Sequence, residues 1–547
     1  MKKIIVDGKE YEVKDKSSYF DVSKIIETNG RIPYLVKVGH DVKELRRTVK
    51  DGENIEILYF DDEFVKQAYA RTATFMMLKS INDVYGDKEA YLKFKIQNSY
   101  YFEVKGKTIN EKDVKLIDEA FAKLVKDKII IEKKEFAKRD ALDIINENKM
   151  EDVRLLFKYS YKPTIKLRYI GDFVRYINGE LLYHTGFIKY YKISQYKDGL
   201  IITLPVSNDE KQVEVKIPGD KEFDTLNDST NWAEKLKINT VGKINENIAN
   251  DNFNNLVIMA ESYQEKQIGD IAEAVKKSGK KFVFIGGPSS SGKTSFSHRL
   301  AYHLIALDLK PHVIACDNFF KERVDTPRDE NGDYDFECLD AMAVDLLCNT
   351  IQRLLNNEEV EMPTYNFVTG QKEYKGDTLK LNDNDVAIFE GIHCLNPAFV
   401  PTISQDEIFK VHVSALTEMC IDNINRIATS DPRLIRRLIR DIQTRKISAK
   451  DTLLRWDSVK KGEEKSVFPY QERADIYFNS ALIYEFNVIK NLALAKLYQI
   501  ADDEEVGMLA RRLIKTLNFF LSATSTEAIP AYSIIREFLG NSIMGVV

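Results

Sequence analysis

Two glycines, a lysine and a threonine stand at a spacing that suits phosphate binding. After the apolar run Phe282–Ile285, the chain reads G-P-S-S-S-G-K-T from Gly287 to Thr294. Gly287 and Gly292 allow a tight loop whose N–H groups converge on phosphate oxygens. Lys293 would bring a positive charge to the β- and γ-phosphates, and Thr294 would offer its hydroxyl to Mg²⁺. The pattern therefore predicts a nucleotide-phosphate loop.

The elements on either side of the loop strengthen this interpretation. The run 282–285 predicts a buried strand, and residues 294–304 predict the helix that follows, whose N-terminus favours anions. A turn rich in glycine and serine is the alternative, but the order of strand, loop, Lys, Thr and helix argues against it. The residues expected to bind ATP are Gly287, Pro288, Ser289, Ser290, Ser291, Gly292, Lys293, Thr294 and Ser295.

Two acidic residues follow further apolar runs that predict strands. Asp317 follows the run 313–316, and Glu390 follows the run 386–389. In a parallel sheet the C-terminal strand ends border the crevice where ligands bind. Asp317 could take the proton of an attacking hydroxyl and help to hold Mg²⁺, and Glu390 could bind Mg²⁺ directly or through water. A strand-end cap or a surface position is the alternative for each acid, and the loop in the same sheet disfavours it.

A basic segment, residues 432–441, predicts a helix. Its four arginines recur at three- and four-residue steps and would share one side, with leucines and isoleucines on the other. Such a row suits a lid that closes on a transferring phosphoryl group. A solvated amphipathic helix and an RNA contact are the alternatives. The arginines are Arg433, Arg436, Arg437 and Arg440.

Composition limits the class of protein. The chain has 547 residues, of which 44% are hydrophobic and 30% charged, with a net charge of −5 and a pI near 6.0. Bulk charge therefore does not direct it to nucleic acid or anionic membranes. The five cysteines form no CxxC pair, which predicts neither a zinc site nor a disulfide framework and suits a cytoplasmic location. No apolar run approaches the ~20 residues of a membrane helix, and the start lacks the apolar core of a secretory signal.

A chain of this length predicts several domains, because one domain usually holds ~100–200 residues. Apolar runs alternate with amphipathic segments in the second half, which predicts a parallel sheet with helices on both faces. The expected strands there are 282–285, 313–316, 386–389, 409–413 and 476–478. In the first unit we expect a short helix over 21–26, capped by Asp21. The expected units are 1–60, 61–225, a connecting segment 226–275, 276–490 and a helical extension 491–547.

The motifs of the second half together resemble the uridine kinase branch of the phosphoribulokinase/uridine kinase family. The resemblance covers residues 280–490. Besides the loop and the arginine helix, the matching segments are Asp317-Asn318-Phe319-Phe320, Tyr334-Asp335-Phe336-Glu337 with Asp340-Ala341, Pro363-Thr364-Tyr365-Asn366-Phe367, Phe389-Glu390-Gly391-Ile392 and Ala474-Asp475-Ile476.

The resemblance implies a role for each matching residue. Asp317 would be the catalytic base, Asp340 would hold the ribose hydroxyls, and Tyr365 would line the nucleoside pocket. We therefore expect Asp317 and Lys293 to be catalytic, and Thr294, Glu390 and Asp317 to hold Mg²⁺. Substrate would be bound by Asp340, Tyr365, Arg436, Arg437 and Arg440. Gly370 stands where the family has a histidine that reads the pyrimidine, so the accepted base stays open.

The front half resembles parts of aminoacyl-tRNA synthetases. Residues 1–60, with short strands around Asp7-Gly8 and before Tyr59, resemble the β-grasp TGS domain. Residues 61–225 are similar to the second additional domain of threonyl-tRNA synthetases, with Tyr69–Leu78 where that family has HxxxH and His184-Thr185-Gly186 at its HTG-like turn. No histidine lies between His40 and His184, so we expect the zinc-dependent editing chemistry to be absent.

The predicted protein is therefore a multidomain α/β chain. A TGS-like β-grasp unit and a synthetase-like α+β unit precede a P-loop kinase domain and a helical extension. The predicted activity is ATP- and Mg²⁺-dependent phosphorylation of a ribonucleoside 5′-hydroxyl, with uridine or cytidine as substrate. The alternatives are an RNA- or ribosome-associated regulator with the P-loop domain as a nucleotide switch, and a kinase for another small sugar or alcohol. We expect no membrane partner; RNA contact through the front half and a homo-oligomer are both compatible with the sequence.

Overall fold

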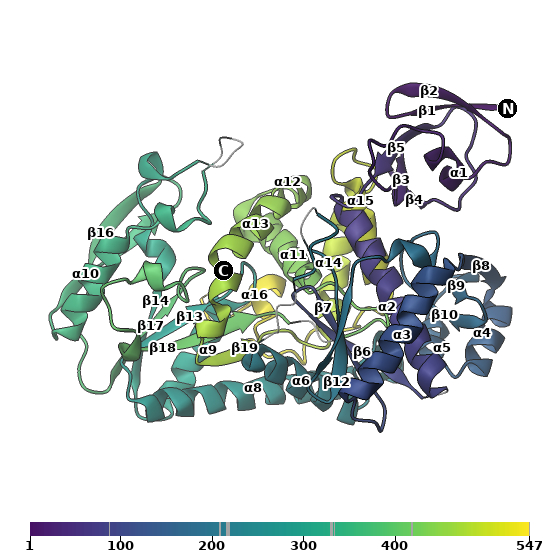
Figure 1. The fold of residues 1–547 in the computed structure, drawn as a ribbon. Coiled ribbons are helices and arrows are strands. Elements are labelled where there is room, and N and C mark those ends of the chain that lie inside the picture. Colours follow the sequence, from purple (N-terminus) through teal and green to yellow (C-terminus); the bar gives the residue numbers. More distant parts are fainter. Residues whose placement is uncertain are drawn as a thin grey trace.

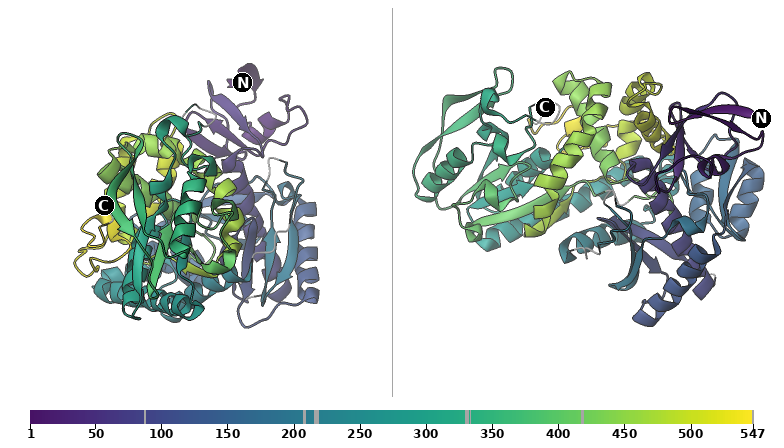
Figure 2. Two further views of the ribbon diagram at one scale, coloured as in Figure 1. Left: turned by 90° about the vertical axis from the view of Figure 1, so that its left-hand side faces the viewer. Right: turned by 45° about the horizontal axis from the view of Figure 1, so that its top comes forward.

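The computed structural model describes residues 1–545, except 87, 207–208, 215–218, 329–331, 333 and 417–418. A front half of small sheets and helices lies beside a half built on one parallel sheet, and helices from both halves fill the space between them (Figures 1 and 2). The mixed α/β architecture confirms the predicted fold class.

The first sheet has five strands in the order β2-β1-β5-β3-β4. Strands β1 and β5 pair in parallel, and the other neighbours are antiparallel. Alternate residues of β1 point inward, which explains why Ile4 and Val6 are buried while their neighbours are not. The strands are β1 (Lys2–Val6), β2 (Lys9–Val13), β3 (Leu35–Val38), β4 (Asp41–Glu44) and β5 (Asn54–Leu58).

The helix of this first unit differs from its prediction. Helix α1 spans Tyr19–Ser23, and its N-cap is Ser18 rather than Asp21. The Ser18 side chain accepts from the Asp21 N–H, and the Asp21 carboxylate accepts from the Ser18 N–H at 3.0 Å. Asp21 is thus the third residue of a capping box, and the predicted cap was three residues too late in the chain.

Two antiparallel sheets follow the long helix α2 (Glu63–Tyr85). One has the strand order β11-β12-β7-β6, and the other β10-β9-β8. Their strands are β6 (Ala90–Ile96), β7 (Ser99–Val104), β8 (Ile131–Ala137), β9 (Thr164–Ile170), β10 (Phe173–Arg175), β11 (Lys192–Tyr196) and β12 (Gly199–Thr203). The helices between them are α3 (Glu111–Asp127), α4 (Lys138–Glu147) and α5 (Glu151–Lys158).

The second half is organised by a five-stranded sheet in the order β14-β17-β13-β18-β19. Every neighbouring pair is parallel, and each strand overlaps one of the five predicted strands. An antiparallel hairpin, β15-β16, projects beside it (Figure 1). The strands are β13 (Phe282–Gly286), β14 (Lys310–Ala315), β15 (Val360–Asn366), β16 (Gln371–Leu379), β17 (Asp385–Glu390), β18 (Ile408–Ser414) and β19 (Ile476–Asn479).

Helices cover this sheet and link it to the front half. The long α8 runs beneath the molecule in Figure 1. The predicted helical extension is confirmed by α14 and α15. The helices are α6 (Asp220–Lys235), α7 (Val241–Ala249), α8 (Phe253–Ser278), α9 (Lys293–Ile305), α10 (Val344–Leu355), α11 (Ser430–Arg440), α12 (Ala449–Leu454), α13 (Trp456–Ser466), α14 (Glu485–Gln499), α15 (Gly507–Leu517) and α16 (Arg536–Leu539).

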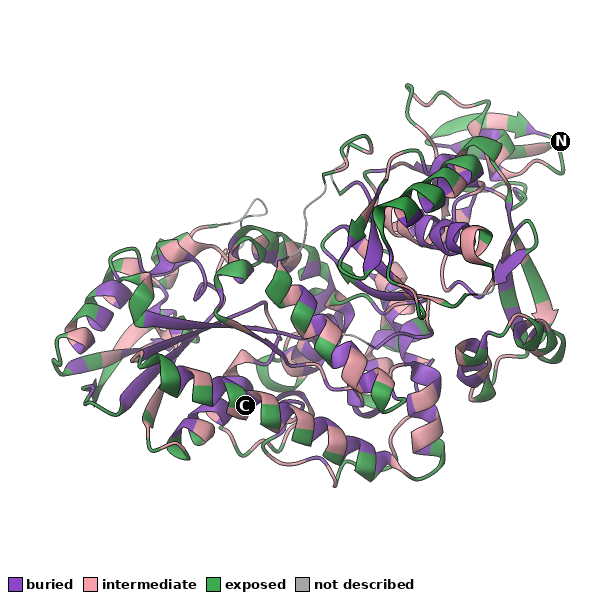
Figure 3. Cartoon of the chain, turned by 60° about the horizontal axis from the view of Figure 1, so that its bottom comes forward, coloured by how far each residue is buried: buried purple, intermediate pink, exposed green. Residues whose placement is uncertain are grey.

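The largest buried core joins segments far apart in the sequence. It includes Ile145 and Leu156 of the front half, Val257 of α8, Leu438 of α11 and Phe538 of α16. Figure 3 shows the buried residues continuing through this region. The residues between 226 and 275 therefore contribute to a common core and are not an exposed linker.

Two polar contacts attach α15 to its surroundings. Arg511 lies near Asp41 of β4, with 3.7 Å between nitrogen and oxygen. Arg512 donates two hydrogen bonds to the buried carboxylate of Asp431, at 2.8 and 3.0 Å. Asp431 is in the first turn of α11, so α15 touches both the first sheet and the arginine helix. Within the described part of the chain, no helix has the length and apolarity needed to cross a membrane.

Candidate functional site

The phosphate-binding loop connects β13 to α9, and its backbone requires its glycines. A β-carbon on Gly287 would lie 2.0 Å from the carbonyl oxygen of Val413, and one on Gly292, where φ is +80°, would lie 2.7 Å from Ile534. Neither position can accept a side chain without displacing a neighbour. The hydroxyls of Ser290 and Ser291 are buried and have no hydrogen-bond partner. No described contact therefore uses these two hydroxyls.

The functional side chains predicted at three strand ends come together. In the parallel register Glu390 of β17 lies opposite Ile285 of β13 and Ala315 of β14. Glu390 accepts a hydrogen bond from the Thr294 hydroxyl at 3.0 Å. Asp317 lies just beyond the end of β14. The positive charge of Lys293 favours the ionised form of both Asp317 and Glu390. Lys293 itself donates to the Pro288 carbonyl at 3.0 Å.

The two acids are electrostatically distinct from ordinary surface carboxylates. Burial raises the pKa of Glu390 to about 7, and Lys293 opposes this shift only in part. The surrounding protein atoms also raise the pKa of Asp317, although its side chain remains open to solvent. The positive charges of Lys293, Arg445 and Arg440 oppose that rise. A carboxyl group whose proton affinity is increased near a phosphate loop suits proton transfer.

The arginine helix α11 lies beside the loop, and two of its arginines, Arg433 and Arg436, are buried. Arg437 donates to the Ser289 hydroxyl at 3.0 Å. Arg433 is buried against Glu463 at 2.6 Å, and the same carboxylate accepts from the Ser289 N–H at 2.9 Å. Arg440 lies 3.6 Å from Glu537. The helix therefore contacts the loop through several polar groups.

Arg436 departs most from its expected place. Its side chain is 0% exposed, and it donates to both oxygens of Glu485, at 2.5 and 2.6 Å, and to the Ser480 carbonyl at 2.9 Å. A β-carbon on Gly292 would lie 3.8 Å from its guanidinium, so Arg436 sits directly beneath the loop. Glu485 and Ser480 occupy its donors in this structure, and contact of Arg436 with substrate stays a prediction.

Two acidic residues of the site were missed in the sequence. Glu537 of α16 accepts from the Ser295 hydroxyl at 2.7 Å, and Glu463 of α13 accepts from the loop as described. Both are buried. They come from segments with no recognisable local motif, so no signal in the sequence placed them at the loop.

Two acidic residues of segment 334–341, Glu337 and Asp340, differ in their surroundings. Glu337 lies 4.0 Å from Arg437, and burial raises its pKa while Asp317 and Lys293 act on it as well. Asp340, the acid expected to bind ribose, is exposed, and no described contact joins it to this group. Glu337 is therefore the acid of this segment that contacts the arginine helix, through Arg437.

Aromatic side chains gather next to these acids. Tyr365 is buried, and its ring centroid lies 5.8 Å from that of Phe320 and 5.0 Å from that of Phe367. Gly370 has φ of +72°, and a β-carbon there would lie 2.6 Å from Arg323. Arg323 thus occupies the space beside Gly370, where its N–H also donates to the Gly370 carbonyl at 2.8 Å.

The oxygen-bearing side chains near the loop fit Mg²⁺. This ion usually takes one or two carboxylates and fills its other positions with water and substrate phosphates. Thr294, Glu390 and Asp317 supply such oxygens. The described residues hold no cluster of three or more His, Cys, Asp or Glu side chains suited to a metal, so an all-protein cage is absent among them. That pattern matches a metal bound together with a phosphate ligand.

Comparisons with known proteins find relatives for each half. The uridine kinase of Mycoplasma genitalium is 31% identical over 161 residues, covering 29% of this chain and 67% of that protein. The uridine kinase of Chlamydia pneumoniae is 28% identical over 216 residues, covering 39% of this chain and 87% of that protein. The solved structure of a possible uridine kinase from Bacillus stearothermophilus is 17% identical, with a TM-score of 0.27, and covers 39% of this chain and 98% of that one.

The front half has a different relative. The threonine–tRNA ligase of Acetivibrio thermocellus is 24% identical over 190 residues, or 34% of this chain. The chain spans only 30% of the length of that ligase. The model of the Phosphoribulokinase / Uridine kinase family matches residues 282–482, which include the loop, both strand-end acids and the arginine helix. Through this second half, the chain belongs to the phosphoribulokinase/uridine kinase family.

Proposed function

We propose that this protein transfers the γ-phosphoryl group of ATP to the 5′-hydroxyl of a ribonucleoside, uridine or cytidine. The observation that carries the proposal is the group formed at adjacent strand ends by Lys293, the Thr294–Glu390 hydrogen bond of 3.0 Å, and Asp317. The family relatives named uridine kinase support the substrate class.

Each residue of the group would perform a separate part of the reaction. The loop amides, Lys293 and the hydroxyls of Ser290 and Ser291 would hold the phosphates. Mg²⁺, held by Thr294 and Glu390, would neutralise charge on the phosphates when bound. Asp317 would orient the acceptor hydroxyl and take its proton, which the raised pKa of this carboxyl favours.

The nucleoside would lie between Asp317 and the aromatic side chains. Tyr365 and Phe367 offer ring faces and edges to a base, and Glu337 offers a carboxylate to the ribose hydroxyls. We assign Glu337 this role in place of Asp340, because Glu337 lies in the same charged group as Asp317. Arg323 lies beside Gly370, and its guanidinium donates to the carbonyls of Phe367 and Val368. Arg437 and Arg440 would contact phosphate, while Arg436 supports the loop from below.

A direct assay tests this function. Purified protein is incubated with Mg-ATP and each common nucleoside, and the monophosphate product is measured. Asp317→Asn should lower kcat by roughly 10²–10⁴-fold and leave ATP binding within about twofold, because it removes the proton acceptor while the amide keeps an oxygen at that position and Thr294 and Glu390 still hold the metal. Asp308→Asn is the matched control, since Asp308 lies at the opposite end of β14. Turnover of the Asp317 variant at the wild-type rate, or ATP consumption with RNA alone, would refute the proposal.

A further inference from the structure

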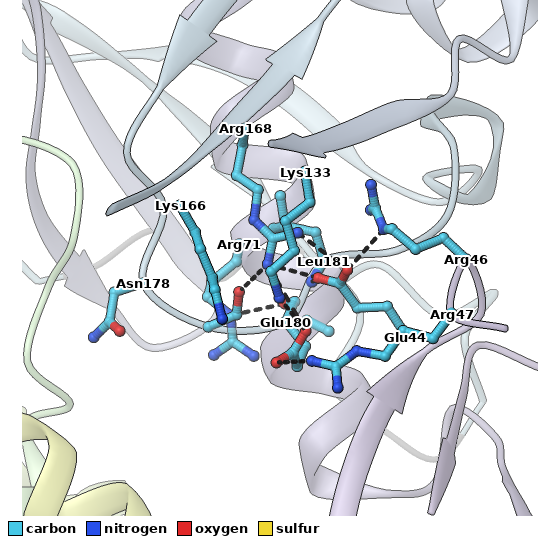
Figure 4. Close-up of polar contacts among 12 residues, drawn as sticks. Glu44, Arg46, Arg47, Arg71, Lys133, Lys166, Arg168, Asn178, Glu180 and Leu181 are labelled. Carbon is cyan, nitrogen blue, oxygen red and sulfur yellow. Dashed lines mark hydrogen bonds and ion pairs between the residues drawn. The ribbon is translucent and has the colours of Figure 1, made fainter. Parts of the chain in front are cut away.

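A second charged centre is formed by residues from four distant segments of the chain. Arg46 follows β4 in the first sheet, Arg71 is on α2, Arg168 is on β9, and Lys515 is on α15 of the helical extension. Figure 4 shows the side chains from the front half converging on one another. We call this set the cationic cluster; it consists of Glu44, Arg46, Arg71, Lys133, Arg168, Glu180 and Lys515.

One of its two carboxylates is fully engaged inside the protein. Glu44 is 0% exposed and lies 2.7 Å from Arg168 and 2.7 Å from Arg46. It also accepts from the Leu181 N–H at 2.9 Å. Burial alone would raise its pKa, but the two arginines outweigh burial and hold its pKa well below the usual range. Glu44 is therefore ionised, and its two oxygens are already occupied by Arg168, Arg46 and the Leu181 N–H.

The second carboxylate, that of Glu180, lies farther from its cationic neighbours than Glu44 does from its own. Glu180 lies 3.5 Å from Lys133 and 3.8 Å from Arg168. Burial, followed by repulsion from Glu44, raises the pKa of Glu180. Arg47 lies 3.9 Å from Glu180 as well. Two carboxylates therefore face six cationic side chains: Arg47 and, within the cluster, Arg46, Arg71, Lys133, Arg168 and Lys515.

Several of these cations lack partners. Arg71 donates through Nε to the Glu180 carbonyl at 3.1 Å and forms no described ion pair. Lys515 makes no hydrogen bond or ion pair to any described residue. Nε of Arg168, whose side chain is 2% exposed, and Nη1 of Arg46 are buried without a hydrogen-bond partner. A network that served only to hold the fold would be expected to balance its charges and satisfy its donors.

The lowered pKa values of two cations reflect the same surplus of positive charge. Burial lowers the pKa of Lys515 to about 8; Glu180 opposes this shift, and Lys162, Arg71 and Lys133 add to it. Burial also lowers the pKa of Arg71 to about 10, with Arg512 and Arg168 contributing repulsion. Lys515 nevertheless keeps contact with solvent, so a ligand can reach it.

We propose that the cationic cluster binds a small phosphate-bearing anion, inorganic pyrophosphate or the polyphosphate group of a nucleotide. The surplus of positive charge matches an anion with more than one negative charge. The planar fork of Arg71 suits phosphate oxygens, which accept two parallel N–H bonds from one guanidinium, whereas the fork of Arg168 is already engaged by Glu44 and the Gly179 carbonyl. The site is separate from the phosphate loop: α2, β9 and α15 lie in the right half of Figure 1, whereas β13 and α9, which flank the loop, lie in its left half.

Binding is tested on the full chain carrying Lys293→Ala, which weakens phosphate binding at the loop. Isothermal titration calorimetry uses three probes: inorganic pyrophosphate, UTP and a short single-stranded RNA. Pyrophosphate should bind, and its affinity should fall as salt rises. Bound anion should raise the pKa of Lys515, so at pH 8 binding should take up protons, read from the heats in buffers of different ionisation enthalpy.

Lys515→Met is the critical variant, because this exposed side chain has no described contact whose loss would unfold the protein. It should weaken pyrophosphate binding by about tenfold or more and abolish most of the proton uptake. Lys133→Met is the second variant and should weaken binding similarly. Lys277→Met, at the exposed C-terminal end of α8, is the matched control and should leave binding unchanged. All variants should keep the same melting temperature within a few degrees.

The probes separate the two sources of phosphate. UTP binding about tenfold tighter than pyrophosphate would assign a nucleotide ligand, and equal affinities would assign the inorganic anion. The proposal is overturned if Lys515→Met binds pyrophosphate as the control does. It is equally overturned if the RNA binds while pyrophosphate and UTP do not, because the ligand would then be a macromolecule.

Discussion

Replacing Arg436 by methionine should destabilise the protein strongly, because its partner would stay buried and charged. Glu485 is 3% exposed, and Arg436 supplies two hydrogen bonds to its oxygens at 2.5 and 2.6 Å. Removing one member of a buried ion pair costs ~3–5 kcal/mol. For a domain of about 200 residues, this loss of stability corresponds to a fall of roughly 8–16 °C in Tm. Glu485→Leu should cost a similar amount, since it leaves the guanidinium unpaired.

The double variant, Arg436→Met with Glu485→Leu, should recover most of that loss. With both charges gone, the main remaining cost is the Ser480 carbonyl, which loses the donor at 2.9 Å. An unsatisfied buried acceptor costs ~1–3 kcal/mol, so the double variant should melt only about 3–8 °C below the wild type. Differential scanning calorimetry measures the three transitions.

The same double variant distinguishes a structural arginine from one that binds substrate. Below its melting temperature it should keep the KM for nucleoside within about threefold, because Arg436 faces Glu485 and not the acceptor. If the double variant melts as low as the single variants, the buried-pair reasoning is wrong. If it is well folded but its KM rises by tenfold or more, Arg436 contacts substrate after all.

Two other residues of the site give predictions. In the absence of nucleotide and Mg²⁺, the free energy of unfolding of the wild type should fall by up to about 3 kcal/mol as pH rises from about 4.5 to about 7. Glu390 in the folded protein keeps its proton up to a pKa of about 7, whereas the same side chain in the unfolded chain releases its proton near pH 4.5. Glu390→Gln should flatten this part of the Tm–pH curve, and an unchanged slope would count against the raised pKa. Glu537→Gln removes a negative charge hydrogen-bonded to Ser295, so the KM for ATP should fall roughly fivefold, ~1 kcal/mol. A higher KM in the kinase assay would instead mean that Glu537 helps to position the loop.

The parallel sheet could be predicted because its signals are local. The strand before Gly287 and the acids at positions 317 and 390 each follow an apolar run directly. Parallel register then brings the strand ends together without further information, as the pairing of Ile285 with Glu390 shows. The departures at α1 are equally local, since Ser18 and Asp21 both belong to one capping box.

The contacts that could not be predicted join segments far apart in the chain. Periodicity placed Arg433 and Arg436 on the polar side of α11, but burial of that side depends on Glu463 and Glu485, which arrive from α13 and α14. Glu537 reaches the loop from 242 residues away. A charged side chain is buried only where an oppositely charged partner is buried with it, and the sequence of one helix does not reveal where that partner lies.

The bidentate pair between Arg512 and Asp431 connects the two charged centres of the molecule. One end of the pair is on the helix that carries Lys515, and the other is in the first turn of the helix that carries Arg437. If an anion drew Arg512 toward Arg71, Asp431 would lose its counter-ion. Reciprocity then requires that nucleotide at the loop change the affinity of that anion by the same factor as the anion changes the affinity of the nucleotide.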